Sequence, residues 1–482
     1  MTDPPRSPDS PSRPWVLPQF AAAWRSEDPQ TMTFALPGGD DEVSQRHARA
    51  VVDVALRVGE ALLVLGTAAS DAAATALRVL HTYGVTSAQV DVTFTSITVS
   101  VHRGLEEDPL TVMRVVRQRR LDHSRLQNVQ RLIDRVTTVH SSVRPSIDEL
   151  RDELVHALRA PRPYRTWVST LGGALMAAGI VVTLGGGPVG MLLAALSAAV
   201  VTEVVAALGR AAFPTFYVQV IGAAIPSALA VGLAWLQLHD RGVTGTDSPS
   251  LVAISGVVVL LAGMTVVGAS QDALDGYYVT ASARGLEVVV VTMGIAVGIG
   301  LVMTLAMRAG LPVTISPQMT SSDALLAGLA AAVLVGVGYA LSTRTALRTT
   351  VLAGLAAPLV FAVHLPMTGL GLPVGFAVAV PAVLAGALGF AAQHRLQVPE
   401  QVMTSAAIIM LIPGRAVYQG LDQLIAAGDV NGGLEQLLGA LGTGLGLAAG
   451  VSVGSFLARR IVGLDQIARR VLRGRQRTDR VE

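Results

Sequence analysis

Residues 404–456 decide the fold, and they read TSAAIIMLIPGRAVYQGLDQLIAAGDVNGGLEQLLGALGTGLGLAAGVSVGSF. An apolar run breaks at Pro413-Gly414, Arg415 follows, and a polar piece with Asp422 and Asp429 leads into a second apolar run. Proline removes a backbone donor and clashes with the preceding turn. A bilayer tolerates such a break only where protein or water satisfies the freed backbone groups. The stretch therefore predicts an interrupted membrane helix.

The same plan occurs earlier in the chain. Gly263 ends an apolar run and lies 151 positions before Gly414, and Asp272 and Asp275 occupy the polar piece. The following helix repeats at a spacing of 148 positions, which pairs Gly285, Gly294 and Gly298 with Gly433, Gly442 and Gly446. A single three-residue gap therefore aligns two segments of about 40 residues. We interpret this as an internal duplication.

Composition excludes an ordinary soluble protein. The 482 residues are 51% hydrophobic and 15% charged, which is typical of a polytopic membrane protein. With no cysteine, neither a disulfide framework nor a thiolate metal site is possible. The net charge of +2 gives no reason to expect nucleic acid as a partner. No basic stretch followed by an apolar core opens the chain, so we expect no cleaved signal peptide.

Charge divides the chain into parts. Residues 1–165 hold 20 Arg and 20 acidic residues, whereas residues 166–458 hold 8 Arg and 11 acidic residues. The predicted parts are a disordered tail (1–42), a small cytoplasmic α+β domain (43–160), two membrane repeats (166–310 and 320–458) and a basic cytoplasmic tail (459–482).

Periodicity predicts the elements of the α+β domain. Gly66 ends a first helix over 43–65, and Ser70 is the expected N-cap of a second helix that stops at Gly84. Strict alternation predicts strands over 90–94 and 97–101. A third strand over 110–116 and helices over 126–139 and 146–158 complete the domain.

An arginine cluster in this domain has two interpretations. It could contact anionic lipid headgroups, or it could be a solvated face, since Asp122 and Asp134 are interleaved with it. Glu60 and the histidines at 81, 102 and 123 match no metal-ligand spacing. The cluster consists of Arg114, Arg117, Arg119, Arg120, Arg125, Arg131 and Arg135.

A membrane span needs about 20 mostly apolar residues. Ten such stretches occur, at 167–184, 189–207, 216–236, 251–269, 286–306, 323–341, 349–364, 372–392, 402–420 and 434–457. If residues 1–165 are cytoplasmic, the outside loops hold only Arg241 and Arg308, which satisfies the positive-inside rule. We therefore expect both termini to be cytoplasmic.

Because each half has an odd number of spans, five, the second half is inserted upside down relative to the first. The predicted fold class is a polytopic α-helical membrane protein with ten transmembrane helices as two inverted five-helix repeats, preceded by the α+β domain. Inverted repeats with interrupted helices are a recurring design of secondary transporters, although channels can also be built this way.

Four groups of residues along the chain carry a resemblance to a known family. They are Ala55-Leu56-Arg57-Val58-Gly59-Glu60-Ala61-Leu62-Leu63, Pro161-Arg162-Pro163-Tyr164, Leu411-Ile412-Pro413-Gly414 and Gly428-Asp429 with Gly433-Leu434. Over about residues 43–458 the chain resembles the threonine/serine exporter (ThrE) family. One departure is Leu261-Ala262-Gly263, where the family commonly has a proline before the glycine. The resemblance implies export of small hydroxy amino acids driven by the proton gradient, with no other cofactor.

The helix break is the expected substrate site. A helix that restarts after Pro413-Gly414 directs free N–H groups and the positive end of its dipole into the break. Arg415 adds a fixed positive charge for a substrate carboxylate, although it could instead reach the interface or pair with an acid of the other repeat. The predicted substrate-binding residues are Gly263, Pro413, Gly414, Arg415, Gln271 and Gln423.

Acidic residues near the breaks are candidates for ammonium binding or proton coupling. Coupling needs a carboxyl group whose pKa rises toward neutrality through desolvation. The alternative for Asp272, Asp275 and Asp422 is a role as solvated loop acids. Glu203, with Arg210 seven positions on, is either a proton relay or a structural ion pair. The predicted proton-coupling residues are Asp272, Asp275, Asp422 and Glu203.

The repeated interrupted helices favour a secondary active transporter, and the resemblance implies an exporter in the inner membrane that works as a proton antiporter. Its expected partners are a small amino-acid substrate and membrane lipid, with a homo-oligomer as a further option. A passive channel, or an exporter of another small metabolite, is the alternative. No convergent nucleophile or metal constellation occurs in 43–160, so we expect no enzyme, catalytic residue or metal site. The absence of a G-x-x-x-x-G-K-[ST] loop argues against a primary pump.

Overall fold

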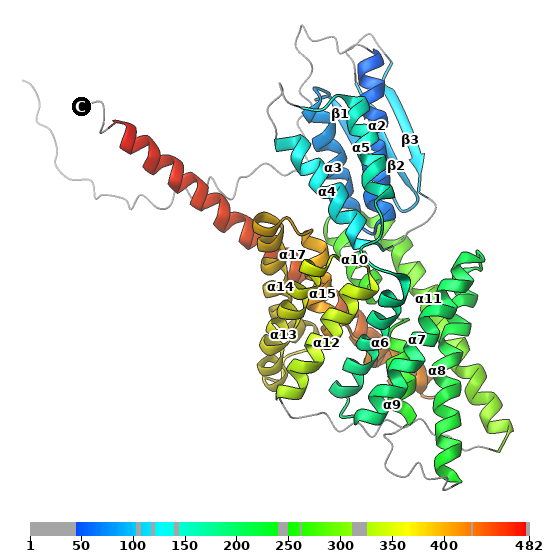
Figure 1. Cartoon of the computed structure of the whole chain (residues 1–482). Helices are drawn as coiled ribbons and strands as arrows, with labels where there is room; N and C mark the ends of the chain where they lie inside the picture. Colours follow the sequence, from blue (N-terminus) through cyan, green and yellow to red (C-terminus); the bar gives the residue numbers. More distant parts are fainter. Residues whose placement is uncertain are drawn as a thin grey trace, which may run out of the picture.

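A computed structural model describes residues 45–102, 108–116, 121–138, 144–239, 249–260, 263–310, 325–425 and 428–478. The predicted tail over 1–42 lies outside the described residues. The described residues form an N-terminal region (residues 45–159) at one end of a set of long helices, the membrane region (residues 166–478) (Figure 1).

The N-terminal region combines a three-stranded sheet with helices. The strands are antiparallel in the order β1-β2-β3, and Thr93 pairs with Ser96 at the first hairpin. Alternation buries Ile97, Val99 and Val101 of β2 against the helices. The elements are α2 (Gln45–Val64), α3 (Ala69–Thr82), β1 (Ala88–Thr93), β2 (Ser96–Val101), β3 (Leu110–Val115), α4 (His123–Thr138) and α5 (Ile147–Arg159).

The helix caps differ in where their acceptors come from. Ser146 caps α5 within the same segment through a capping box with Glu149. The expected N-cap of α3, Ser70, is wrong: the N-cap is Ala68, which offers no side-chain acceptor. The backbone N–H of Ala69 instead donates to Asp272 of the membrane region, at 3.0 Å. Local sequence could not predict this cap because its acceptor lies far along the chain.

Eight helices among the described residues are long and apolar enough to cross a membrane. The other two expected spans, 251–269 and 402–420, are each divided between shorter helices. The membrane helices are α6 (Thr166–Thr183), α7 (Pro188–Arg210), α8 (Thr215–Leu238), α9 (Pro249–Val258), α10 (Gly263–Leu274), α11 (Tyr278–Arg308), α12 (Leu325–Ser342), α13 (Leu347–Gly369), α14 (Val374–Leu396), α15 (Glu400–Ile408), the 3-10 turn η2 (Ile409–Leu411), α16 (Gly414–Ile425) and α17 (Val430–Thr478).

Two glycine stripes allow close helix packing. In α17, a Cβ atom on Gly446, Gly450 or Gly454 would overlap the backbone of α14, whereas one on Gly442 would meet nothing within 4 Å. In α11, a Cβ on Gly294 or Gly298 would overlap the backbone of α8 in the same way. Small residues let membrane helices approach to backbone contact. The last helix of each half thus packs on the third helix of the same half.

The two halves of the membrane region share a packing pattern. We call residues 166–308 the first half and residues 325–462 the second half. Helix α6 packs on α7 as α12 packs on α13, α8 packs on α9 as α14 packs on α15, and α10 packs on α11 as α16 packs on α17. Between the halves, α6 packs along α12.

Candidate functional site

Two interrupted helices lie at corresponding places in the two halves. Helix α10 begins at Gly263 and α16 begins at Gly414, the positions at which the sequence predicts a restart. The carbonyl of Pro413 accepts the first helical hydrogen bond of α16, from the N–H of Val417 at 3.1 Å. The N–H of Gly414 donates to the carbonyl of Ile412 at 2.8 Å. The start of each restarted helix still carries the positive end of a helix dipole, the feature that suits an anionic group.

A large cavity lies between the N-terminal region and the membrane region, beside the places where the two regions touch. Its volume is about 1590 Å³, and α3, β1, α10, α11, α15 and α17 contribute to its walls. Its membrane end is lined by side-chain hydroxyls and amides together with apolar groups. The hydroxyl and amide residues are Thr265, Gln271, Tyr339, Gln401, Thr404, Ser405, Ser452 and Ser455.

The predicted substrate residues are unevenly placed around this cavity. Gln271 lines the cavity, and the first residue of α10 to do so is Met264, one position after Gly263. Pro413, Gly414 and Gln423 are not among the described lining residues. The side chain of Arg415 lies outside the described residues, as does that of Asp422. The cavity therefore reaches the first break and not, among the described residues, the second.

Asp272 belongs to a buried ion pair between α10, α11 and the N-terminal region. Its Oδ2 lies 2.9 Å from Nη1 of Arg284, and both side chains are at most 5% exposed. Its Oδ1 accepts from the N–H of Ala69, and Nη2 of Arg284 donates to the carbonyl of Thr67 at 3.2 Å. Breaking such a pair is costly because it leaves a buried charge uncompensated. These contacts favour an anchoring role for Asp272.

Asp275 lies in the turn that directly follows α10 and lines the cavity. The hydroxyl of Ser70 donates to its Oδ2 at 2.6 Å, and the side chain is half-buried. Four other carboxylates, Asp71, Asp91, Glu287 and Glu400, line the same cavity. Asp275 is therefore the one described residue of the predicted proton-coupling set that lines the cavity.

Asp71 is an acid that the sequence analysis did not select. Asp71 is exposed to the cavity, and the protein around that cavity reduces the hydration of its carboxyl, which raises its pKa to about 6. The charges of Glu400 and Asp275 add to the rise, and Arg459 opposes it. Arg459 also pairs with Glu400 at 2.9 Å. In the sequence Asp71 is an ordinary first-turn acid of a helix, so only the tertiary arrangement reveals it.

The second interrupted helix has the opposite environment. Tyr418 of α16 is 1% exposed, and with Leu421 it packs in a cluster with Ile254 of α9 and Ile295 of α11. Asp429 accepts from the N–H of Gly432 at 3.0 Å and so caps the start of α17. The face of α16 that turns toward α9 and α11 is therefore sealed.

Glu203 and the glutamine Gln423 lie away from the cavity. Glu203 is exposed on α7 and accepts a hydrogen bond from the hydroxyl of Thr170 in α6. It is not among the described cavity-lining residues. The backbone carbonyl of Gln423 accepts from the N–H of Asp429 at 2.9 Å, which closes the turn before α17.

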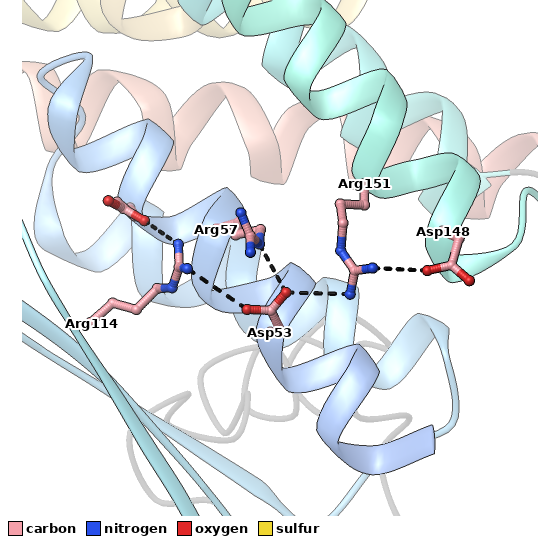
Figure 2. A network of polar contacts seen from close by, with 6 residues as sticks. Asp53, Arg57, Arg114, Asp148 and Arg151 are labelled. Atoms are coloured by element: carbon pink, nitrogen blue, oxygen red, sulfur yellow. Dashed lines mark hydrogen bonds and ion pairs between the residues drawn. The ribbon is translucent and has the colours of Figure 1, made fainter. Parts of the chain in front are cut away.

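The polar residues of the N-terminal region form ion pairs with one another (Figure 2). Asp53 lies 2.8 Å from Arg57, 3.4 Å from Arg151 and 3.8 Å from Arg114, and Arg114 also pairs with Glu60 at 2.5 Å. Partial burial of Asp53 works against ionisation, but these arginines, Arg57 first, keep its pKa below the usual value.

For Arg114 this pairing favours the solvated-face interpretation over lipid binding. Arg117, Arg119 and Arg120, which belong to the same cluster in the sequence, lie outside the described residues. No group of three or more potential metal ligands occurs within the described part of the chain.

Comparison with known proteins agrees with this architecture. A family model for threonine/serine exporters matches residues 53–306, more than half of the chain, and a second, "Threonine/Serine exporter, ThrE", matches residues 328–457. The chain belongs to the threonine/serine exporter family. The boundary between the two family matches falls between α11 and α12, where the first half ends and the second begins.

Two relatives of the threonine/serine exporter family align with most of the chain. The "Probable threonine/serine exporter" of Mycobacterium tuberculosis is 35% identical over 87% of this chain and 78% of that relative. The "Threonine/serine exporter" of Corynebacterium glutamicum is 33% identical over 85% of this chain and 83% of that relative. No solved structure matches. The family is one of transporters rather than enzymes, and this chain is a multi-pass membrane protein.

Proposed function

We propose that this chain exports threonine, serine or similar small amino acids across the inner membrane as a proton antiporter. The names of the two relatives support the substrate class. The observation that carries the mechanism is the contrast between the two interrupted helices, since α10 lines a cavity and α16 is sealed against α9 and α11. Among the described residues, the cavity thus lies beside the first break, whereas the face of α16 that turns toward α9 and α11 is packed with side chains.

The two halves act as inverted repeats. Contacts between α6 and α12 support this relation: a Cβ on Gly338 would meet the carbonyl of Gly172, and a Cβ on Gly179 would meet the carbonyl of Ala331. Both contacts fit one antiparallel register. Adding 159 to a residue number of α6 gives the equivalent residue of α12, which pairs Gly172 with Ala331 and Gly179 with Gly338. The contact between Gly338 and Gly172 is therefore equivalent to the contact between Gly179 and Ala331. A two-fold axis between α6 and α12 would produce this pattern.

The N-terminal region lies in the cytoplasm, and the cavity is the cytoplasmic entrance. The arginine distribution around the spans supports this orientation. Threonine would enter between α3 and α10 and move toward Thr265, Thr404 and Ser405, whose hydroxyls match its own hydrogen-bonding capacity. Apolar groups at Met264 and Ile408 suit the rest of a small side chain.

The substrate carboxylate binds at the helix restarts. In the first half this site is the start of α10, where Met264 and Thr265 line the cavity, and Gly414 with Arg415 provides the equivalent site in the second half. Inverted-repeat transporters place substrates at interrupted helices near the middle of the membrane. Gln271 is positioned to hold the same group on the cytoplasmic side.

Asp275 carries the coupling proton and alternates between the proton and the substrate ammonium. Its place in the cavity beside Ser70, with the carboxyl of Asp71 nearby, supports this role. Protonation of Asp275 would remove the charge that attracts the ammonium, which links proton entry to substrate release. In this proposal Asp422, an acid in the polar piece of the second half, has the same role there.

Efflux of labelled threonine from loaded proteoliposomes tests the proposal. We expect efflux to accelerate when an inward proton gradient is imposed and to slow when an ionophore collapses it. Efflux that is saturable but insensitive to the proton gradient would contradict proton antiport. Efflux that is neither saturable nor gradient-sensitive would support the alternative, a passive channel. The sealed face of α16 argues against a continuously open pore.

A further inference from the structure

The turn between α2 and α3 contacts both halves of the membrane region. Toward the first half, Thr67 accepts from Arg284 at 3.2 Å and Ser70 donates to Asp275 at 2.6 Å. Toward the second half, Nε2 of Gln401 donates to the carbonyl of Gly66 at 2.6 Å. Residues 66–70 therefore bridge α10 and α11 of one half to α15 of the other.

Helix α4 adds a second set of contacts, all with the second half. The N–H of His123 donates to the carbonyl of Thr343 at 3.0 Å, and its Nδ1 lies 3.3 Å from the hydroxyl of Thr345. Nε2 of Gln127 donates to the carbonyl of Gln397 at 3.1 Å. The ring of His123 also lies 5.9 Å from the ring of Tyr339, a residue of the cavity wall.

Apolar burial joins the two regions as well. Val402 of α15, 2% exposed, belongs to the hydrophobic core of the N-terminal region, and Tyr277 packs against that core from the turn before α11. Thr280 of α11 donates to the carbonyl of Val92 in β1 at 3.3 Å. The N-terminal region is thus attached to both halves through desolvated contacts.

We infer that the N-terminal region is a strap that holds the two halves in the cytoplasm-open arrangement and has to loosen on one half before the outward-facing state can form. The inference rests on the proposed function, because it assumes that the halves move relative to each other. An element bonded to both halves cannot keep all its contacts when their relation changes. The strap would therefore set how often the outer side opens.

A single cysteine on α16 can report outer opening, because the chain has no native cysteine. Val417 lies on the sealed side of α16, packed against the cluster that contains Tyr418. In right-side-out vesicles, a membrane-impermeant maleimide should label Val417→Cys only when that side opens. The strap is weakened by Ser70→Ala together with Gln401→Ala, which removes one bond to each half.

We expect the weakened strap to raise the labelling rate by about tenfold, since each lost hydrogen bond is worth a few-fold in an equilibrium constant. The matched control is Arg135→Ala, which breaks the ion pair between Arg135 and Glu153 inside the N-terminal region and should leave labelling unchanged. A second variant, Gln127→Ala with Thr345→Ala, weakens the α4 contacts and should also accelerate labelling.

Equal labelling rates in both strap variants, the control and the parent would overturn the strap. Labelling needs no substrate, so it separates this inference from the proposed function. A strap effect in a protein that fails to export threonine would reject the substrate and keep the strap. Normal threonine export with unchanged labelling would reject the strap and keep the exporter.

Discussion

Helices α10 and α16 are built to one plan and lie in different environments. Each has 12 residues and begins at a glycine after a break in the preceding helix. The side chains of Thr265 and Gln271 on α10 face a cavity, whereas Tyr418 and Leu421 on α16 are buried in a core. Because the local designs match, the difference comes from how each helix packs on its surroundings.

The comparison also shows which features the two halves share and which feature only the first half has. Asp272 and Arg284 form an ion pair in the first half, and the repeat offsets place Gln423 and Gly432 at the corresponding positions of the second half. The shared parts are the breaks, the glycine stripes and the packing order. The ion pair belongs to the side of the molecule where the N-terminal region docks, so attachment rather than transport explains it.

The largest expected effects are losses of threonine efflux, and one of them concerns Asp275, the cavity acid in the turn after α10. Asp275→Asn should reduce threonine efflux by about 100-fold or more, because a positioned acid–base group commonly supplies that factor. Efflux from proteoliposomes measures the effect, and Asp429→Asn is the matched control because Asp429 only caps α17. Wild-type efflux in Asp275→Asn would show that this carboxyl has no coupling role.

Arg415 tests whether the second break is equivalent to the first. Arg415→Ala should abolish efflux while the protein still inserts, because the substrate carboxylate would lose its fixed counter-charge. Efflux is again the measurement, with protease protection or detergent-extracted yield as the check on insertion. An Arg415→Ala protein that transports normally would leave the second half without a substrate-binding role.

The ion pair tests the difference between the halves through stability. Arg284→Gln should destabilise the protein by roughly 3–5 kcal/mol, because it leaves Asp272 charged and buried. Adding Asp272→Asn should recover most of that loss, since neither side chain is then charged. Thermal unfolding in detergent measures both effects. If the double variant is as unstable as Arg284→Gln alone, the pair is not the anchor.

The glycine stripe of α17 offers a comparison within one helix. Gly454→Ala should cost about 1–3 kcal/mol, because its Cβ would overlap the backbone at Val383. Gly442→Ala should be neutral or stabilising by up to about 1 kcal/mol, because nothing lies within 4 Å of its Cβ and alanine favours the helix. Melting temperatures check the pair. Equal losses at both positions would contradict the packing of α17 on α14.

Two titratable groups of the N-terminal region, His123 and Asp71, should make the stability of the protein depend on pH in opposite directions. Burial lowers the pKa of His123 from 6.5 to about 4, so its contribution is present above pH 6.5 and disappears as pH falls toward 4. At pH 5 the loss is about 2 kcal/mol. The pKa of Asp71 is raised to about 6, so its contribution is present below pH 3.8 and disappears as pH rises through 6.

Unfolding temperatures between pH 5 and 7 measure these two contributions. His123→Gln should remove the loss on acidification, and Asp71→Asn should remove the loss on the alkaline side. A parent-like pH profile in both variants would place these groups in ordinary aqueous surroundings. A change in only one variant would assign the pH response to that contact.

The sequence predicted the parts of the site that depend on local chemistry. Pro413-Gly414 and the repeated Gly263 predicted where helices restart, because a missing donor and a flexible residue act within a few positions. The strands and the capping box at Ser146 follow from local patterns as well. The inverted relation and the ten-span count stay predictions from the repeat and the arginine distribution.

Contacts between distant segments could not be predicted in this way. The cap of α3 comes from Asp272, more than two hundred positions away, and Ser70 serves Asp275 rather than its own helix. Arg284 stands between two predicted spans in the sequence, and the structure buries it in an ion pair with Asp272. Desolvation at the cavity raises the pKa of Asp71, and the charges of Glu400 and Asp275 add to the rise. Such features depend on the docking of two regions.

The most direct measurement compares single cysteines at Thr265 on α10 and Val417 on α16 in the cysteine-free chain. Impermeant maleimides are applied from each side of the membrane, with and without an inward proton gradient and threonine inside. The account predicts that cytoplasmic labelling at Thr265→Cys falls as outside labelling at Val417→Cys rises, because the two helices exchange environments. Sites that stay open to one side under all conditions, or that react from both sides at once, would contradict it.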